Sequence, residues 1–274
     1  MSRDALSRDV YAAEALLSFW AWAGVDTCYE DTAVDRTVKA AIARASRPSV
    51  AVSRANVSAP IDPTVAAATD TIADARRMAD GAQSLQELAA AIAAFDGCPL
   101  KTSGARQAVF YRGTADAPVF VIGEAPGADE DMQGQPFVGR AGQLLDRMLR
   151  AAALDKRAFI TNTVFWRPPG NRTPTLAEQQ VCAPFLERAI ELVAPRVLLI
   201  VGGASAKAVL GVGEGILSIR GRWFEWRSRD GAAVIPALPT LHPAFLLRQP
   251  AAKKKTWADM LTLIERLDRI DHST

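Results

Sequence analysis

VFVIGEAPGADEDMQGQPFVGRAG, residues 119–142, joins a short apolar run to a turn rich in glycine, proline and acidic residues. The run Pro118–Gly123 is almost entirely apolar, which is typical of a strand covered on both faces. A helix is expected next, over Gly139–Ala153. In α/β proteins the ligand binds beyond the carboxyl ends of the parallel strands, so the acidic turn after Gly123 is a candidate site.

Strand and helix patterns continue to alternate towards the C-terminus. Asn162 falls in the second predicted strand and His242 follows the fourth, so both are expected at the same edge of the sheet as the acidic turn. This alternation predicts a three-layer α/β/α fold with a short, mostly parallel central sheet. Further strands are predicted at Phe159–Val164, Val197–Val201 and Val234–Leu238, helices at Leu176–Val193, after Gly202-Gly203 and at Thr256–Leu267, and a short hairpin segment at Ile216–Trp226.

The N-terminal third of the chain differs from the rest in composition and is rich in alanine. Helical spacing of apolar residues covers residues 1–46 and 64–95, and residues 47–63 contain three prolines and three serines, as expected of a linker. The sequence therefore predicts a helical extension over residues 1–95 and a catalytic domain over residues 96–274. The arginines of the extension are scattered, which favours a helical layer packed on the core over a DNA-contacting arm.

The composition indicates a folded protein and argues against membrane-spanning, secreted and disulfide-rich proteins. Of the 274 residues, 49% are hydrophobic, and none of the apolar runs is long enough to cross a membrane. The N-terminus lacks the apolar core of a signal peptide, so a cytoplasmic protein is expected. The net charge of +2 permits nucleic-acid binding without requiring it. Cys28, Cys98 and Cys182 are too widely spaced for a disulfide framework or a self-evident metal site.

The turn GEAPG, residues 123–127, follows a strand as a phosphate-binding loop does. It lacks the glycine spacing of a dinucleotide-binding loop and the lysine of a nucleoside-triphosphate loop. It also carries Glu124 where a phosphate site presents backbone amides. A carboxylate at this place suits a positively charged transition state better than a phosphate, so a nucleotide-binding α/β protein is disfavoured.

Three motifs, in consistent order over roughly residues 95–268, carry a resemblance to a known family. They are GEAPGADEDMQGQPFVGRAGQLLDRML, ITNTVFWRPPGNRTP and LHPAFLLRQP. The chain resembles the uracil-DNA glycosylase superfamily, and most of all its thermophile-type family-four enzymes. The resemblance implies hydrolysis of the N-glycosidic bond of deoxyuridine in DNA, with the base extruded from the duplex and an abasic site left behind.

The resemblance also implies roles for individual residues. Phe137 would stack on the base, and Asn162 would read it, because an amide can both donate to a carbonyl and accept from an imide N–H. His242 would donate to uracil O2 as the base departs as an anion. Gly123 and Ala125 would complete the base-binding loop.

Two acids match acidic positions of the family motif. Glu124 and Glu130 are both candidates to stabilise the sugar cation and to orient water, and the choice between them stays open. Asp129 and Asp131 are expected to be solvated acids of the turn. Asn171, in the loop after the Arg-Pro-Pro run, would help to hold the site.

DNA contact is expected around the same cleft. Arg167, Arg172 and Arg248 would bind phosphates, and Leu246, Leu247 or Arg248 would fill the gap that base extrusion leaves in the stack. The expected partner is uracil-containing DNA, single- or double-stranded, and the expected state is a monomer.

The sequence departs from family four at the four cysteines that hold an iron–sulfur cluster. Cys98 keeps one position of the first pair, and its partner position is occupied by Phe95 or, in the other register, by Lys101. Trp166 occupies the third position and Cys182 matches the fourth. Two thiolates do not satisfy a cluster that requires four, so no cofactor and no metal are expected, and the two thiols should lie close together.

Two alternatives to uracil excision remain at this stage. One is a glycosylase for another deaminated base, hypoxanthine or xanthine. The other is a DNA-damage binding protein that keeps the fold without turnover. The joint presence of Glu124, Glu130, Asn162 and His242 argues against the second alternative.

Overall fold

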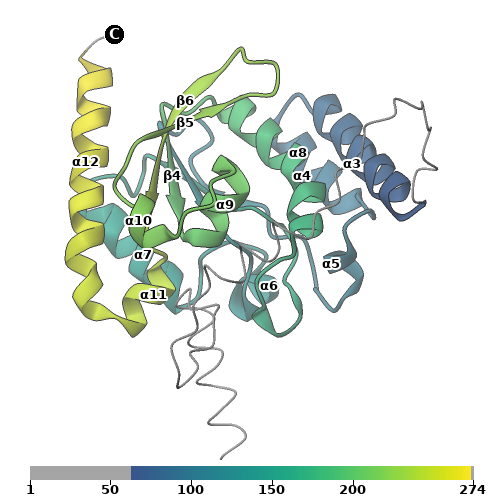
Figure 1. Cartoon of the computed structure of the whole chain (residues 1–274), viewed down its shortest axis with the longest axis horizontal. Helices are drawn as coiled ribbons and strands as arrows, with labels where there is room; N and C mark the ends of the chain where they lie inside the picture. The colour runs from purple at the N-terminus through teal and green to yellow at the C-terminus, as the bar shows by residue number, and fades with distance from the viewer. Residues whose placement is uncertain (1–62, 273–274) are drawn as a thin grey trace, which may run out of the picture. The chain divides into compact units, whose positions relative to one another are not determined.

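The structure, a computed structural model, describes residues 63–272 (Figure 1). The helical pattern predicted over residues 1–46 lies outside the described residues, as does the predicted linker apart from Pro63, which begins a helix. Within residues 63–272, no helix is both long and apolar enough to cross a lipid bilayer.

In the described part of the chain, a mixed sheet has the strand order β1-β3-β2-β4-β6-β5. The four inner strands are parallel to one another, and the edge strands β1 and β5 pair antiparallel with β3 and β6. The strands are β1 Tyr111–Gly113, β2 Val119–Gly123, β3 Ala158–Asn162, β4 Val197–Val201, β5 Phe224–Arg227 and β6 Val234–Thr240. The predicted short, mostly parallel sheet is confirmed.

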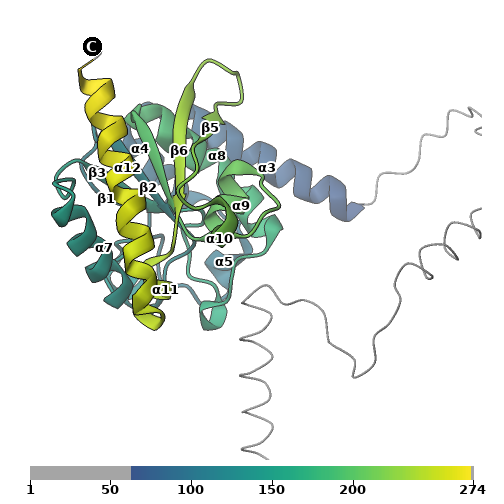
Figure 2. The same cartoon turned by 60° about the vertical axis from the view of Figure 1, so that its left-hand side comes forward.

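Helices cover both faces of the sheet, as Figures 1 and 2 show. The longer ones are α3 Pro63–Gly81, α4 Leu85–Ala94, α7 Arg140–Ala151, α8 Leu176–Val193, α9 Gly203–Leu210 and α12 Lys253–Asp271. The shorter ones are α5 Pro99–Thr102, α6 Ala128–Gln133, η1 Pro169–Asn171, α10 Ile216–Ile219, α11 Pro243–Arg248 and η2 Pro250–Ala252.

Alternate side chains of each inner strand point to opposite faces, so each strand contributes to two cores. On β2, Val119 and Val121 belong to a buried cluster that contains residues of α7 and α12. Phe120 and Ile122 belong to a second cluster, with Phe185 of α8. This double coverage explains the almost unbroken apolar character of the strands and confirms the three-layer α/β/α architecture.

Helices α3 and α4 are part of the same compact unit as the sheet, which extends from residue 61 onwards. Leu88 and Ile92 of α4 are fully buried in the cluster that contains Phe185. Arg76 of α3 forms an ion pair with Glu187 of α8. The boundary expected at residue 95 therefore does not separate these helices from the catalytic domain, and the predicted helical layer on the core is present over residues 63–94.

The hairpin segment predicted at Ile216–Trp226 is wrong in its first half. Ile216–Ile219 forms the short helix α10, and only Phe224–Arg227 is a strand. The hairpin consists instead of β5 and β6, joined through the turn that contains Asp230-Gly231. An Asp-Gly pair between two strand patterns is a strong turn signal, and here it determines which strands pair.

Candidate active site

The site begins where β2 and β3 end side by side. Gly123 is the register partner of Asn162, the last residue of β3. The amide of Thr163 donates to the carbonyl of Gly123 at 2.9 Å, and the Thr163 hydroxyl donates to the carbonyl of Glu124 at 2.7 Å. These two bonds fix the start of the acidic turn relative to Asn162.

Phe137 is held in an unusual backbone conformation. Its φ of 57° lies in the left-handed region, which is costly for a bulky aromatic residue. The Arg112 side chain donates to the carbonyls of Pro136 at 2.7 Å and of Phe137 at 3.2 Å. A methyl group on Gly142 would lie 1.6 Å from the Phe137 carbonyl, so only glycine lets α7 approach this closely. Surrounding contacts therefore impose the conformation that turns the Phe137 ring towards the strand ends.

The aromatic ring, the amide and the imidazole converge at the carboxyl edge of the sheet. A methyl group on Gly123 would lie 2.3 Å from Phe137 Cζ and 2.4 Å from Asn162 Oδ1, so both side chains lie directly against this glycine. The rings of Phe137 and His242 are 5.8 Å apart, centroid to centroid, with an interplanar angle of 30°. This placement agrees with the expectation that Asn162 and His242 lie at the same edge of the sheet as the turn after Gly123.

Asn162 is 1% exposed. Within residues 63–272, no group donates a hydrogen bond to its Oδ1 atom. A buried polar atom without a partner is rare and calls for an explanation, such as a ligand that supplies the missing donor. Oδ1 is thus a hydrogen-bond acceptor ready for an N–H group beside the Phe137 ring.

His242 is the N-cap of α11 and is partly buried. Its Nδ1 atom accepts a hydrogen bond from the amide of Ala244 at 3.1 Å. Because Nδ1 accepts, the proton of the neutral ring is on Nε2, which is left as a donor. Burial, with a smaller contribution from the positive charge of Arg248, lowers the pKa of His242 to about 4. The imidazole is therefore neutral at physiological pH.

Glu124 is half-buried at the mouth of the site. Burial raises the pKa of its carboxyl above the ordinary value, and a hydrogen bond with the Thr173 side chain opposes that rise. Ala125, the next residue, is half-buried and packs against the hydrophobic core, so its side chain fills space beneath the turn.

Glu130 has both carboxylate oxygens occupied by backbone amides. Oε1 accepts from Val138 and Gly139, each at 2.9 Å, and Oε2 accepts from Gly127 at 3.0 Å. This carboxylate joins the two turns on either side of α6 and so supports the loop that carries Phe137. The geometry favours Glu124 over Glu130 as the acid that faces a substrate.

The prediction of a solvated Asp131 is wrong. Asp131 is 2% exposed, and its Oδ1 atom accepts a hydrogen bond from the amide of Arg106 at 2.8 Å. Asp129 is exposed, as expected. The four acids of one short turn therefore have different environments, and only the fold distinguishes them.

Leu246 is 1% exposed and packs with Leu144 and Leu241. It is a core residue of this conformation, and the prediction that it could wedge into DNA is corrected. Leu247 is half-buried and Arg248 is exposed. The expected DNA contacts of these two residues stay a prediction.

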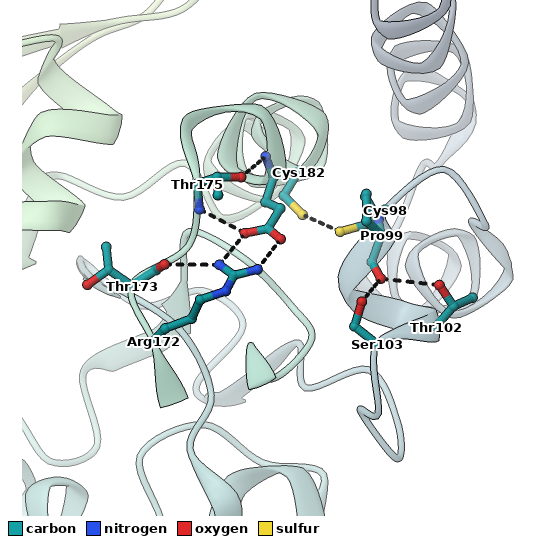
Figure 3. Close-up of polar contacts among 9 residues, drawn as sticks. Cys98, Pro99, Thr102, Ser103, Arg172, Thr173, Thr175 and Cys182 are labelled. Atoms are coloured by element: carbon teal, nitrogen blue, oxygen red, sulfur yellow. Dashed lines mark hydrogen bonds and ion pairs between the residues drawn. The ribbon is translucent and has the colours of Figure 1, made fainter. Parts of the chain in front are cut away.

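Side-chain hydrogen bonds form within the loop after the Arg-Pro-Pro run and between this loop and α8. Arg167 donates to Asn171 Oδ1 at 2.7 Å, and Asn171 has a left-handed backbone with φ of 55°. Arg172 donates through both terminal nitrogens to Glu178, at 2.6 and 2.9 Å (Figure 3). The expected role of Arg172 in phosphate contact is therefore not supported, because a buried carboxylate already engages its guanidinium.

The cysteine positions do not fit a four-thiolate cluster. Cys98 and Cys182 are fully buried, with their sulfur atoms 3.9 Å apart (Figure 3). Burial raises the pKa of the Cys182 thiol well above its ordinary range, so this thiol keeps its proton. Trp166 is fully buried, and Phe95 packs edge-on against Phe185 with centroids 5.2 Å apart. Phe95, Trp166, Cys98 and Cys182 belong to the same buried hydrophobic cluster.

Lys101 lies in a different environment from the two thiols. Its Nζ atom donates to the carbonyls of Ala93 and Phe95 and to the Asp96 carboxylate, at the end of α4. Of the two residues considered for the missing cysteine position, Phe95 is the one buried in the same hydrophobic cluster as the two thiols. Within residues 63–272, no group of three or more acidic, histidine or cysteine side chains is arranged to hold a metal ion.

Sequence reasoning missed several supporting residues. Arg112, on the edge strand β1, fixes the Phe137 turn, and its ion pair with Asp146 of α7 anchors it at 2.6 Å. β1 has only three residues, too few for a periodic signal. Lys253–Lys255 form an exposed basic run at the start of α12, on the same edge of the sheet as His242. That run is visible in the sequence as a charge pattern.

Comparison of the sequence with known proteins identifies the family of this chain. The family model of the uracil DNA glycosylase superfamily matches residues 110–261. A type-4 uracil-DNA glycosylase of Sulfurisphaera tokodaii is 38% identical over 153 residues, which are 54% of this chain and 69% of that protein. The enzyme of the same name from Pyrobaculum aerophilum is 37% identical over 181 residues, covering 64% and 91%. The one from Thermotoga maritima is 39% identical over 153 residues, covering 55% and 77%. The matched region contains Phe137, Asn162, His242 and the turn that carries Glu124, and the chain belongs to the uracil-DNA glycosylase superfamily.

Proposed function

We propose that this chain is a monofunctional uracil-DNA glycosylase, which hydrolyses the N-glycosidic bond of deoxyuridine in DNA, releases uracil and leaves an abasic site. The observation that carries the proposal is the buried, unpaired Oδ1 atom of Asn162 beside the Phe137 ring. The names of the type-4 relatives support the same reaction.

Base selection follows from the amide of Asn162. Its oxygen can accept the N3–H of uracil while its nitrogen donates to O4, whereas cytosine presents an acceptor and a donor in the reverse order. A buried acceptor without a hydrogen bond costs about 1–3 kcal/mol of free energy. A base that leaves Oδ1 unpaired should therefore bind less favourably than uracil by about this free energy. Phe137 supplies the stacking surface, which is worth about 1–3 kcal/mol for a base.

His242 is suited to stabilise the departing base. The ring is neutral and its Nε2–H is free of the bond that occupies Nδ1, so it can donate to O2 as negative charge develops there. A donor that is already oriented needs no reorganisation during the reaction, and such donors contribute about 3–4 kcal/mol.

Glu124 is the acid that can face the sugar. As a carboxylate it would stabilise the oxocarbenium-like sugar and orient the attacking water. Glu130 acts through the loop instead, since all its hydrogen bonds go to backbone amides of the two turns. Glu124 is therefore assigned to the chemistry and Glu130 to positioning Phe137.

The same protein would work without an iron–sulfur cluster, as a monomer in the cytoplasm. An iron–sulfur cluster of this kind needs four thiolates, and the buried pair Cys98 and Cys182 supplies two, which supports the proposal. The packing of Phe95 and Trp166 supports a hydrophobic replacement of the cluster by protein side chains.

DNA contact, with single or double strands, would extend from α11 to the start of α12. Lys253–Lys255 occupy the first turn of α12, which has no side-chain cap and no acidic residue. Positive charge at this end opposes the helix dipole and disfavours the helix. Phosphate groups would neutralise that charge, which supports a role for the three lysines in holding the strand that carries the extruded base.

Purified protein incubated with otherwise identical oligonucleotides should release uracil and leave alkali-labile sites, but should not act on cytosine, which presents its acceptor and donor in the reverse order. Asn162→Asp should lower the single-turnover rate on uracil at least about 100-fold, because a carboxylate cannot donate to O4. The variant should gain detectable excision of cytosine. Full activity of the variant on uracil would remove Asn162 from base recognition.

The imidazole of His242 should titrate with a midpoint near 4. The chain has two histidines, so proton NMR of the His272→Gln variant reports His242 alone. Since the folded pKa lies below the ordinary 6.5, this group favours the native state above pH 6.5 and that stability is lost as the pH falls towards 4. His242→Gln should slow excision about 10²–10³-fold on single and double strands alike. A midpoint near 6.5 would contradict a neutral donor.

As purified, the protein should be colourless and free of stoichiometric iron. Elemental analysis and visible absorbance measure this directly, before and after reconstitution with iron and sulfide. The matched variant is Phe95→Cys/Trp166→Cys, which restores the four-cysteine pattern and provides the comparison for cluster uptake. Stoichiometric iron with charge-transfer absorbance in the unmodified protein would overturn the proposal of a cluster-free enzyme.

Removal of the basic run should weaken the salt dependence of excision. For the Lys253→Gln/Lys254→Gln/Lys255→Gln variant, the slope of log kcat/KM against log salt should become shallower by about 0.7–0.9 for each phosphate that the lysines neutralise. The charge-matched control, Arg147→Gln/Arg150→Gln/Lys156→Gln, changes exposed residues towards the far edge of the sheet and should keep the original slope. Equal slopes for both variants would mean that the lysines do not touch DNA.

A further inference from the structure

One buried carboxylate is bonded to the end of the strand that leads to His242. Asp259 of α12 is 2% exposed, and its Oδ2 atom accepts hydrogen bonds from the hydroxyl of Thr240 at 2.6 Å and from Nε of Arg220 at 3.1 Å. Its Oδ1 atom accepts from Nη2 of the same arginine. Thr240 is the last residue of β6, and Arg220 directly follows α10. Asp259 therefore joins three separate elements of the fold.

The end of β6 is fixed from two sides, and His242 lies beside it. Thr240 is the register partner of Val201 in β4. Its carbonyl accepts from the amide of Gly202 at 2.9 Å, and its hydroxyl donates to Asp259. A methyl group on Gly202 would lie 3.3 Å from both Cβ and Cδ2 of His242, so the imidazole packs against this glycine. The place of the ring thus depends on the backbone that Thr240 and Gly202 share.

The arginine of this network also reaches the basic run at the start of α12. Nη2 of Arg220 donates to the carbonyl of Lys255 as well as to Asp259. The next amide, that of Gly221, donates to the carbonyl of Pro239 in β6 at 2.9 Å. A methyl group on Gly221 would lie 2.6 Å from Oδ1 of Asp259, so a larger residue would push the carboxylate away. The turn after α10 is thereby attached to both β6 and α12.

Stability alone is a weak explanation for this buried ion pair. Taking two charges out of water has a cost that offsets most of their attraction, and apolar side chains of similar size often give an equally stable fold. Hydrogen bonds to a charged group are strong and directional, so they fix the orientation of what they hold. The hydroxyl held here is on Thr240, two residues before His242. The network is therefore suited to keeping the end of β6 in one position.

We propose that Asp259 is a positioning residue, which acts through Thr240 to hold the His242 imidazole where it can donate to the departing base. This inference rests on the proposed function, in which His242 is that donor. Because Asp259 is buried, its effect passes through Thr240 and not through contact with the substrate. Arg220 completes the hydrogen bonds of the carboxylate and links it to the first turn of α12.

The first experiment compares Thr240→Val, which removes the hydroxyl, with Thr240→Ser, which keeps it. Thr240→Val should slow single-turnover excision of uracil at saturating DNA about 10-fold, because a small displacement of a catalytic group is costly. The DNA concentration that gives half the maximal rate should not change. Thr240→Ser should retain the rate of the unmodified protein. Thr262→Val is the matched control, since this hydroxyl donates within α12, to the carbonyl of Ala258 at 3.1 Å, and it should also retain the rate.

The second experiment repeats the change in the His242→Gln variant. Thr240→Val should slow excision when His242 is present but not when it is absent, because the group that is positioned has then been removed. Asp259→Asn should likewise slow excision only when His242 is present. Circular dichroism and thermal unfolding verify that each variant folds, and the Thr240 variants decide the question if Asp259→Asn does not.

Proton NMR of the imidazole provides a readout that does not depend on activity. In the His272→Gln variant the ring signals belong to His242, and they report its place relative to the Phe137 ring, 5.8 Å away between centroids. These chemical shifts should change on Thr240→Val and stay constant on Thr240→Ser and Thr262→Val. Such a change supports the inference even for a protein that excises nothing, in which case only the proposed function fails.

Three results would overturn the inference. The first is an unchanged His242 spectrum in Thr240→Val. The second, in a protein that excises uracil, is equal slowing by Thr240→Val with and without His242, because that result describes a structural role alone. The third is a loss of rate in Thr240→Ser as large as in Thr240→Val, since the serine keeps the hydroxyl that Asp259 binds.

Discussion

The pairing of β2 with β3 determines the geometry of the site. In this register Gly123 lies opposite Asn162, and the missing side chain of Gly123 lets the Phe137 ring and the Asn162 amide lie against the same piece of backbone. A shift of one residue would replace Asn162 by Thr161, which points to the other face of the sheet. The two hydrophobic cores fix this register, because alternate residues of each strand must be buried on opposite sides. The position of the Asn162 amide relative to the Phe137 ring thus depends on packing in the two cores.

The four acids of the turn illustrate how environment assigns chemistry. Glu124 is half-buried and its pKa is raised, whereas Glu130 and Asp131 accept hydrogen bonds from backbone amides. Asp129 remains exposed. A carboxylate surrounded by amides is a structural anchor, since its charge is already satisfied. Glu124 is neither bonded to backbone amides in this way nor fully exposed as Asp129 is, and this intermediate environment is the reason for its place in the proposed chemistry.

Much of the fold and of the site could be predicted from the sequence, because the relevant signals are local. Continuous apolar runs identified the inner strands, and the helix predicted at Leu176–Val193 has the bounds of α8. The remaining features depend on contacts between distant segments. The buried carboxylate of Asp131 accepts a hydrogen bond from the amide of Arg106, which is 25 residues away in the sequence. Leu246 packs against Leu144 of α7. For Arg172 the sequence showed a charge near the cleft, but it did not show that the Glu178 carboxylate binds this guanidinium.

The unpaired oxygen of Asn162 has a consequence for how this protein can change over time. An apolar side chain of similar size would remove a buried acceptor without a partner, and would therefore be expected to give a more stable fold. In the role proposed for Asn162, the same replacement would also remove the group that distinguishes uracil from cytosine. The stability of the fold and the selection of the base would then oppose each other at a single position.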